Sequence, residues 1–401
     1  MHYHASCEYK LDQVNNIFDG HIYHDLCHTK IEVDGQQLPC NYFSDPRDIA
    51  LGLSTDGFAP FWRHKTTAWP IIVYNYNLPP NIHFHRQYIL CLGVVPGPKK
   101  PKDFDSFLWP AVEEFLMLVL GTRAYDALLH ELFLLWAHLI LIGGDIPAIS
   151  MVMRMKGHNG LSPCWMCKIK GLCIPNSHAT THYVPLDQRW HLDVIDTPAE
   201  TTVAKYDPAD LPLDQHDEIL EMGRQVQHAS TNAEAEQLAK EYGVKGVPIL
   251  SFIQSVQFPW SFPFNFMHLI FKNLVPNLIQ LWTHNFKDLG SADDPFVIRP
   301  TIWQAVGAAT ASCGPTILYS FCSHPQNIAN DKLQCMADTW SFWLQYIAPV
   351  ILENRFTEDK YYWHFIDLVK LVRICLQFEM QKKDIEFVWR GFERWVEKYE
   401  Q

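Results

Sequence analysis

The sequence predicts an α/β protein, with helices flanking a mixed β-sheet in its first part and a helical region in its last part. Strand-like apolar runs that end in turn residues come early in the chain, and a helical pattern separates the third run from the fourth. Aromatic-rich helical patterns follow later. With 401 residues, of which 48% are hydrophobic and 19% charged, the chain can bury a sizeable core in two or three packed units.

Three strands are predicted before the first long helix. Ile49, Leu51 and Leu53 alternate with polar or small residues, so the first strand is expected to end at the turn Ser54-Thr-Asp-Gly57. The second and third strands are expected over residues 69–76 and 88–95. A run of Pro, Gly and Lys then breaks the strand pattern.

The predicted helix after this break covers residues 107–120. Asp105 precedes it and can serve as its N-cap, and Glu113 and Glu114 fall on its solvent-facing side.

A fourth strand is predicted over residues 133–142, and Pro147 marks the start of a helix that extends to about Lys156. The apolar run from Leu132 to Gly144 contains His138 and ends in an acid, which favours a buried strand over a membrane span.

The order of three strands, a helix, a strand and a helix is that of an RNase H-like sheet, in which the first and fourth strands are neighbours. Asp56 and Asp145 would then meet at one end of the sheet. Two facing carboxylates can hold Mg²⁺ or Mn²⁺, and such ions activate a water or a 3′ hydroxyl in phosphodiester chemistry. The commoner roles for such residues are structural, with Asp56 closing a turn and Asp145 capping a helix.

Cys164 and Cys167 form a CxxC turn, which can present two thiolates to one tetrahedral zinc ion. The chain has no second CxxC, so further ligands would be sought among Cys173, His158, His178, His182 and His268. Plain buried cysteines and a redox pair are the alternatives, although the expected strand-to-helix placement of a redox CxxC is missing.

Composition limits the cellular setting and the partners. The 11 cysteines are odd in number and irregularly spaced, which favours free thiols in a reducing compartment. The N-terminus lacks signal-peptide features, so an intracellular protein, nuclear or cytoplasmic, is expected. The net charge of −12 argues against nucleic-acid binding by this segment alone. Lys99, Lys100 and Lys102 form a small basic loop that can touch phosphate, although a solvated turn is commoner.

Five segments are expected along the chain. They are an N-terminal segment (1–47), the first part of the core (48–157), an insertion carrying the CxxC and an acidic, exposed, partly helical stretch (158–262), a returning core helix (263–290) and a helical C-terminal region (291–401).

Several motifs, taken in order, resemble the fungal Plavaka group of CACTA-like DNA transposases. They are LSTDG (53–57), YNLPP (76–80), LGVVPGPKKPKDFD (92–105), GDIPA (144–148), MRMKGHNG (153–160), SPCWMC (162–167), THYVP (181–185), FMHL (266–269), PQNIA (325–329) and WSFW (340–343). No single motif is specific, but their number and order are.

The resemblance implies an RNase H-like core with a DDE-type acidic triad that cuts and joins DNA with Mg²⁺ or Mn²⁺. Asp56 and Asp145 match the first two acids. Cys164 and Cys167 match the zinc-like insertion of such cores, with His268 and His182 as the expected further zinc ligands.

The chain departs from the family pattern at the third acid. Asn265 stands where the family has an Asp, and Lys272 stands where it has a Glu. An ammonium in place of a carboxylate removes a metal ligand and adds repulsion toward the ion. We therefore expect an impaired nuclease, unless Asp288, Asp293 or Asp294 supplies the missing acid.

Three functions stay open at this stage. The first is a transposase core by ancestry, in a fragmentary copy without its terminal-repeat-binding module. The second is a host-retained protein-interaction scaffold, and the third is an active nuclease with its third acid elsewhere. DNA is the partner implied by ancestry, homo-oligomers are compatible with it, and no membrane partner is expected.

Overall fold

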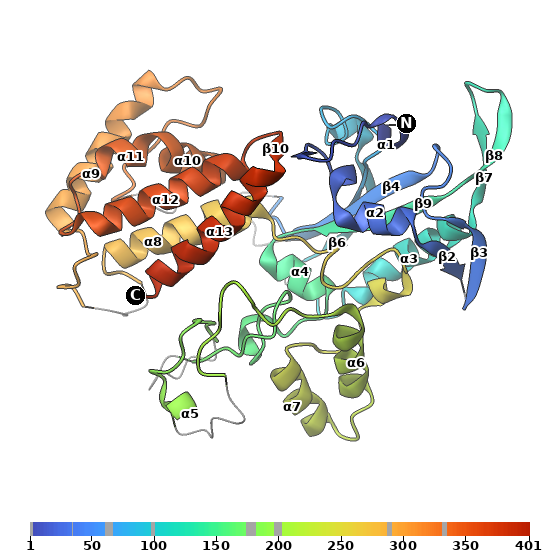
Figure 1. Ribbon diagram of the computed structural model, residues 1–401, viewed down its shortest axis with the longest axis horizontal. Helices are drawn as coiled ribbons and strands as arrows, with labels where there is room; N and C mark the ends of the chain where they lie inside the picture. Colours follow the sequence, from blue (N-terminus) through green and yellow to red (C-terminus); the bar gives the residue numbers. More distant parts are fainter. Residues whose placement is uncertain are drawn as a thin grey trace. The chain divides into compact units, whose positions relative to one another are not determined.

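The computed structural model describes residues 3–33, 35–60, 67–97, 101–173, 182–195, 203–286, 291–330 and 335–401. The chain divides into two compact units, Met1–Phe264 and Asn265–Gln401, which carry the blue-to-yellow and the yellow-to-red elements of Figure 1.

A four-stranded sheet organises the first unit. Its strand order is β6 (Leu90–Pro96), β5 (Ala68–Asn75), β4 (Ile49–Thr55) and β9 (Ala137–Gly143). β4 pairs antiparallel with β5 and parallel with β9, and β5 pairs antiparallel with β6. The predicted adjacency of the first and fourth strands is therefore confirmed.

Both faces of the sheet are buried at its central strand β4, whereas the edge strand β6 is largely exposed. Ile49, Leu51 and Leu53 of β4 pack into one core cluster with apolar residues of α3 (Asp105–Leu120) and α4 (Ile146–Val152). Ala50, on the opposite face, belongs to a second cluster with residues from the first 43 of the chain. The alternation along β4 thus separates two apolar faces, because the strand is central in the sheet.

The N-terminal residues that cover the second face show no clear periodicity in sequence. They form short elements, namely α1 (Tyr3–Ser6), β1 (Gln13–Val14), η1 (Ile17–Asp19), α2 (His21–Cys27), β2 (Lys30–Val33) and β3 (Gln36–Asn41). β2 and β3 pair antiparallel. Elements this short carry too few turns or alternations to give a periodic signal.

The two helices predicted for the first unit form, but α3 starts earlier and α4 ends earlier than the sequence predicted. α3 begins at Asp105, and its N-cap is Phe104, so the predicted capping role of Asp105 is wrong. The Asp105 carboxylate instead pairs with Arg154 at 3.3 Å. Glu113 and Glu114 are exposed, as predicted. α4 ends at Val152 rather than near residue 156, because Arg154 adopts a φ of 53°, which a helix cannot accommodate.

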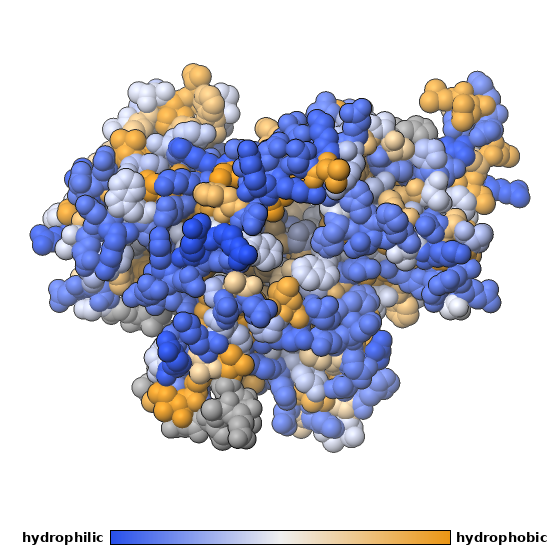
Figure 2. Space-filling model, in the orientation of Figure 1, coloured by the Kyte–Doolittle hydropathy of each residue, from blue (hydrophilic) through white to orange (hydrophobic). Residues whose placement is uncertain are grey.

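The predicted fourth strand is divided at Trp136. Its first part, β8 (Glu131–Leu135), pairs antiparallel with β7 (Thr122–Asp126) in a hairpin that extends away from the four-stranded sheet (Figure 1). Leu132 is 72% exposed, so the expectation of burial holds only for β9. The hairpin carries the apolar side chains at the upper right of Figure 2. Among the described residues, no helix has the length and apolarity that a membrane crossing needs.

The segment between α4 and residue 264 is mostly loop. It contains η3 (Gly157–Asn159), α5 (Leu192–Ile195), α6 (His216–Gln227), α7 (Asn232–Tyr242) and η4 (Ile249–Phe252). The partly helical character is confirmed, but the expected exposure is not uniform. Ile219 and Leu220 are buried in the main core of the first unit, because one side of α6 is apolar. Val244, which follows α7, is buried in the same core.

The second unit is helical, as predicted. Its elements are the π-helix η5 (Met267–Leu274), α8 (Val275–Trp282), α9 (Pro300–Cys313), η6 (Gly314–Thr316), α10 (Ala337–Phe342), the π-helix η8 (Trp343–Ile347), α11 (Ala348–Ile351), α12 (Asp359–Cys375), the short strand β10 (Met380–Gln381) and α13 (Lys382–Tyr399). A single core cluster, which includes Trp303, Trp343 and Leu368, joins these helices.

Candidate functional site

The two predicted carboxylates follow neighbouring parallel strands. Ser54 of β4 is in register with Gly143 of β9, and Asp56 and Asp145 each come two residues later. Both residues are half-buried. Parallel strands present their C-terminal ends at the same edge of a sheet, so both acids lie at one edge.

Close backbone packing fixes this edge. A Cβ on Gly144 would lie 2.8 Å from the Thr55 carbonyl oxygen, and a Cβ on Gly57 would lie 2.5 Å from the Trp69 ring. Neither position therefore accepts a side chain without a shift of its neighbours. The residues directly next to the two acids are held against the sheet.

Asp145 also has the structural role that its position suggested. It is the N-cap of α4, and its Oδ1 accepts the backbone N–H of Ala148 at 2.7 Å. A carboxylate has two oxygens and about four acceptor sites, so this bond leaves capacity for a further ligand. The helix cap and metal ligation are therefore compatible at this residue.

The third predicted position falls in the second unit, at the start of η5. The Asn265 side-chain oxygen accepts the His268 backbone N–H at 3.2 Å, a bond that an Asp would make equally well. Lys272 is exposed, and its ammonium lies 3.5 Å from the Cys335 carbonyl oxygen. Neither side chain offers a carboxylate oxygen to a metal ion.

Cys164 and Cys167 lie together in a loop, as a CxxC turn requires. The backbone N–H of Met166 donates to the Cys164 Sγ at 3.3 Å. A hydrogen bond from the Cys167 thiol, helped by the backbone N–H groups of Met166 and Cys167, lowers the pKa of Cys164 to about 7. The same contact, together with burial, raises the pKa of Cys167. The pair thus favours one thiolate, at Cys164.

The predicted zinc set of Cys164, Cys167, His182 and His268 takes its last member from the second unit and the others from the first. Within the described ranges, no group of three or more His, Cys, Asp or Glu side chains is placed to hold a metal ion. His182 is buried, and its Nδ1 lies 3.4 Å from the His158 carbonyl oxygen. His178 lies outside the described residues, as do Lys99, Lys100 and Asp288. The Nδ1 of His268 is buried and has no hydrogen-bond partner in the described part of the chain.

Two features near these residues were not found from the sequence. Asp214 is buried close to the cysteine pair, because Leu213 bridges Cys167 and the Asp214 N–H donates to Met166. Burial raises the pKa of Asp214 to about 6. The second feature is the Asp105–Arg154 ion pair beyond the end of α4. Neither has a local sequence signal, since the partners are about 50 residues apart in both cases.

Comparison with known families gives one result that bears on this site. Residues 29–200 match the model of the transposase family tnp2. The matched range contains β4, β9, both acids and the cysteine pair, and it ends before the second unit begins. The similarity supports a transposase family for this part of the chain. A search of curated proteins found no match.

Proposed function

We propose that this chain is the catalytic core of a DDE-type DNA transposase with an RNase H-like fold, related to the fungal Plavaka group of CACTA-like elements. The observation that carries the proposal is the parallel register of β4 and β9, because Asp56 and Asp145 follow these two strands at the same edge of the sheet. The match of residues 29–200 to the tnp2 family supports the same class of protein.

Asp56 and Asp145 would supply oxygen ligands to Mg²⁺ or Mn²⁺. The donor chemistry fits these ions, which prefer carboxylate oxygens. When bound, such ions activate the attacking hydroxyl and stabilise the leaving oxygen of a phosphodiester. The cap bond from Ala148 fixes the orientation of Asp145 for this role.

We further propose that catalysis is impaired. The family resemblance, and not the geometry, assigns the third acid to residue 265 or 272, where this chain has Asn265 and Lys272. An amide is a weaker ligand than a carboxylate, and an ammonium repels a divalent cation. Cys164 and Cys167 are proposed as two ligands of a structural zinc ion, with the other ligands still to be identified.

A protein-interaction scaffold without catalysis is the second candidate. It is favoured by the β7–β8 hairpin, where Leu128, Leu129 and Leu132 are 83%, 65% and 72% exposed. Exposed apolar clusters of this kind mark contact surfaces. A scaffold would keep its partner when Asp56 is replaced.

Calorimetric titration of Mn²⁺ tests the catalytic proposal. We expect weak or no binding by the parent and a gained site in Lys272→Glu, with an affinity increase of about tenfold or more, equivalent to about 1.4 kcal/mol. Adding Asp56→Asn to Lys272→Glu should abolish the gained site. Lys383→Glu makes the same charge change at another exposed lysine of the second unit and should gain nothing.

A different result would correct the proposal. Tight Mn²⁺ binding by the parent that depends on Asp56 would mean an intact site with its third acid elsewhere, and thus an active nuclease. Equal gains in Lys272→Glu and Lys383→Glu would show that position 272 has no special relation to the metal site.

A further inference from the structure

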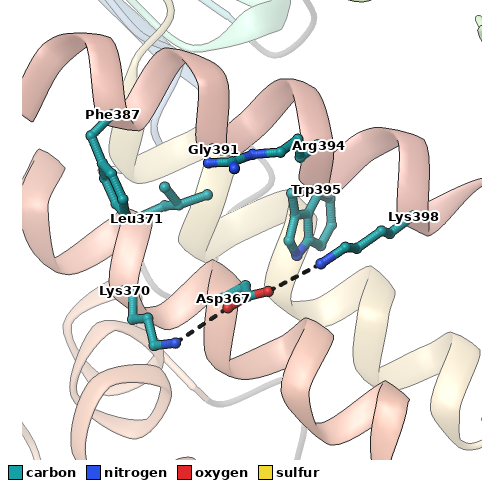
Figure 3. Close-up of a pocket in the computed structure, with 8 residues that line it drawn as sticks. All are labelled: Asp367, Lys370, Leu371, Phe387, Gly391, Arg394, Trp395 and Lys398. Atoms are coloured by element: carbon teal, nitrogen blue, oxygen red, sulfur yellow. Dashed lines mark hydrogen bonds and ion pairs between the residues drawn. The ribbon is translucent and has the colours of Figure 1, made fainter.

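The helices α12 and α13 enclose a pocket of about 200 Å³ in the second unit (Figure 3). Gly391 permits their close approach, because a Cβ at this position would lie 2.3 Å from the Leu371 Cδ2. Leu371 and Trp395 are 3% and 6% exposed and form an apolar floor. The pocket is therefore formed by two closely packed helices.

Reciprocal contacts lock the two helices together behind this pocket. The Trp395 indole Nε1 donates to the His364 carbonyl oxygen at 3.0 Å, and the His364 Nε2 lies 2.9 Å from the Trp395 carbonyl oxygen. The two rings stack with centroids 4.6 Å apart and an interplanar angle of 10°. The side chains at the pocket rim are therefore carried on a fixed backbone.

Cationic side chains dominate the rim. Lys370, Arg394 and Lys398 line the pocket together with one carboxylate, Asp367. Asp367 pairs with Lys370 at 3.3 Å and with Lys398 at 3.5 Å, and Figure 3 shows it between the two ammonium groups. Both lysine side chains remain 58% exposed. Three cations against one anion leave a local charge of about +2.

Arg394 has unused hydrogen-bonding capacity. Its Nε donates to the Arg390 carbonyl oxygen at 3.1 Å, so the side chain extends back along α13. Within the described ranges no carboxylate pairs with Arg394. The terminal nitrogens of a guanidinium are suited to two oxygens of one tetrahedral anion.

We propose that this pocket binds a backbone phosphate of a DNA strand. Arginine and lysine around a concave surface are the groups that bind phosphate oxygens. The pocket volume of about 200 Å³ is well above the ~10–15 Å³ that one water needs on the same measure, and it accommodates a phosphate group. The assignment to a strand, as opposed to a free phosphate, rests on the proposed transposase function. The site also offers a local route to DNA for a chain whose net charge is −12.

Fluorescence anisotropy with a short labelled oligonucleotide tests this pocket. The full chain is titrated without added Mg²⁺ or Mn²⁺, so that metal-dependent binding at Asp56 does not contribute and a structural zinc ion is retained. The triple variant Lys370→Gln, Arg394→Gln, Lys398→Gln is expected to bind about tenfold more weakly or worse, with a log–log salt slope smaller by about one, as for the loss of one phosphate contact.

The matched control removes the same charge elsewhere in the second unit. Arg355→Gln, Lys382→Gln and Lys383→Gln change three exposed cations that do not line the pocket, and should keep the parent affinity within about twofold. Asp56→Asn should bind like the parent, which separates this proposal from the catalytic one. Thermal unfolding of each variant confirms that it is folded.

Two outcomes would overturn the proposal. Equal weakening in the pocket variant and the control variant would mean that only overall charge matters. Binding of inorganic phosphate to the parent, measured by calorimetry, together with no binding of the oligonucleotide would reject a DNA strand as the ligand. Displacement of the oligonucleotide by inorganic phosphate from the parent, but not from the pocket variant, would support a phosphate contact at this pocket.

Discussion

His138 on β9 is a fully buried titratable residue, with 0% exposure. Its ring packs edge-on against Tyr42 and Phe43, with centroids 4.8 and 5.0 Å away. Neither ring nitrogen has a hydrogen-bond partner in the described part of the chain. Burial, together with the nearby His4, lowers the pKa of His138 to about 3. The side chain is therefore held neutral.

This arrangement predicts acid sensitivity that His138→Leu should remove. The unfolded chain binds a proton at this histidine below pH 6.5, whereas the folded chain does not until about pH 3. Stability conferred by the neutral ring is therefore complete above pH 6.5 and falls as the pH falls, by about 1.4 kcal/mol per unit. Between pH 7.5 and 5.0 the parent should lose about 2 kcal/mol more than His138→Leu in urea unfolding.

Two comparisons support the assignment of this effect. His85→Leu changes an exposed histidine and should leave the parent pH dependence in place. Asp48 works in the opposite direction, because burial raises its pKa to about 6, so its contribution to stability is lost as the pH rises. Asp48 is present in both proteins, so the difference between parent and His138→Leu reports the histidine. Parallel pH profiles of the two would contradict the prediction.

The junction of β4, β9 and α4 is the element on which the carboxylate pair depends. Gly144→Ala would place a methyl group 2.8 Å from the Thr55 carbonyl oxygen and 3.1 Å from the Ala148 Cβ. We expect a loss of about 1–3 kcal/mol in the free energy of unfolding, as for other overpacked sites. Chemical denaturation measures this loss. In the Lys272→Glu background, Gly144→Ala should also weaken the gained Mn²⁺ site.

The neighbouring residue Gly143 provides the matched control. A Cβ there would have its nearest contact at 3.8 Å, with the Ser54 Oγ, which is ordinary van der Waals distance. Gly143→Ala should therefore change the unfolding free energy by less than about 0.5 kcal/mol. An equally small loss in the free energy of unfolding for Gly144→Ala would show that α4 can shift away from β4 to accommodate the methyl group.

The chain has separate cores in its two units. Leu139 belongs to the core of the first unit and Leu368 to that of the second, and both are 0% exposed. Leu139→Ala and Leu368→Ala remove the same atoms from the two cores, and each should cost about 2–5 kcal/mol.

Hydrogen exchange read by mass spectrometry locates these losses. Leu139→Ala should speed exchange in peptides from residues 1–264, and Leu368→Ala in peptides from residues 265–401. Faster exchange across both ranges in each variant would show one cooperative unit in place of two cores.

Local sequence patterns predict the order of the elements in the first unit and the neighbours in its sheet. Apolar alternation and turn residues around Leu53 and Asp56 are local signals, and three strands, a helix and a strand permit few topologies. The helical nature of the second unit is equally local, since the patterns over α12 and α13 span several turns. The two acids were predicted because each follows such a strand.

The division of long apolar runs and the surroundings of each site depend on packing in three dimensions. β8 pairs with β7 instead of extending β9. The sequence could not predict this pairing, because a run of leucines suits an exposed hairpin and a buried strand equally well. The contact of Asp214 with Cys167 and the ion pair of Asp367 with Lys398 join residues distant in the chain. Such contacts depend on packing between elements, and no local periodicity encodes them.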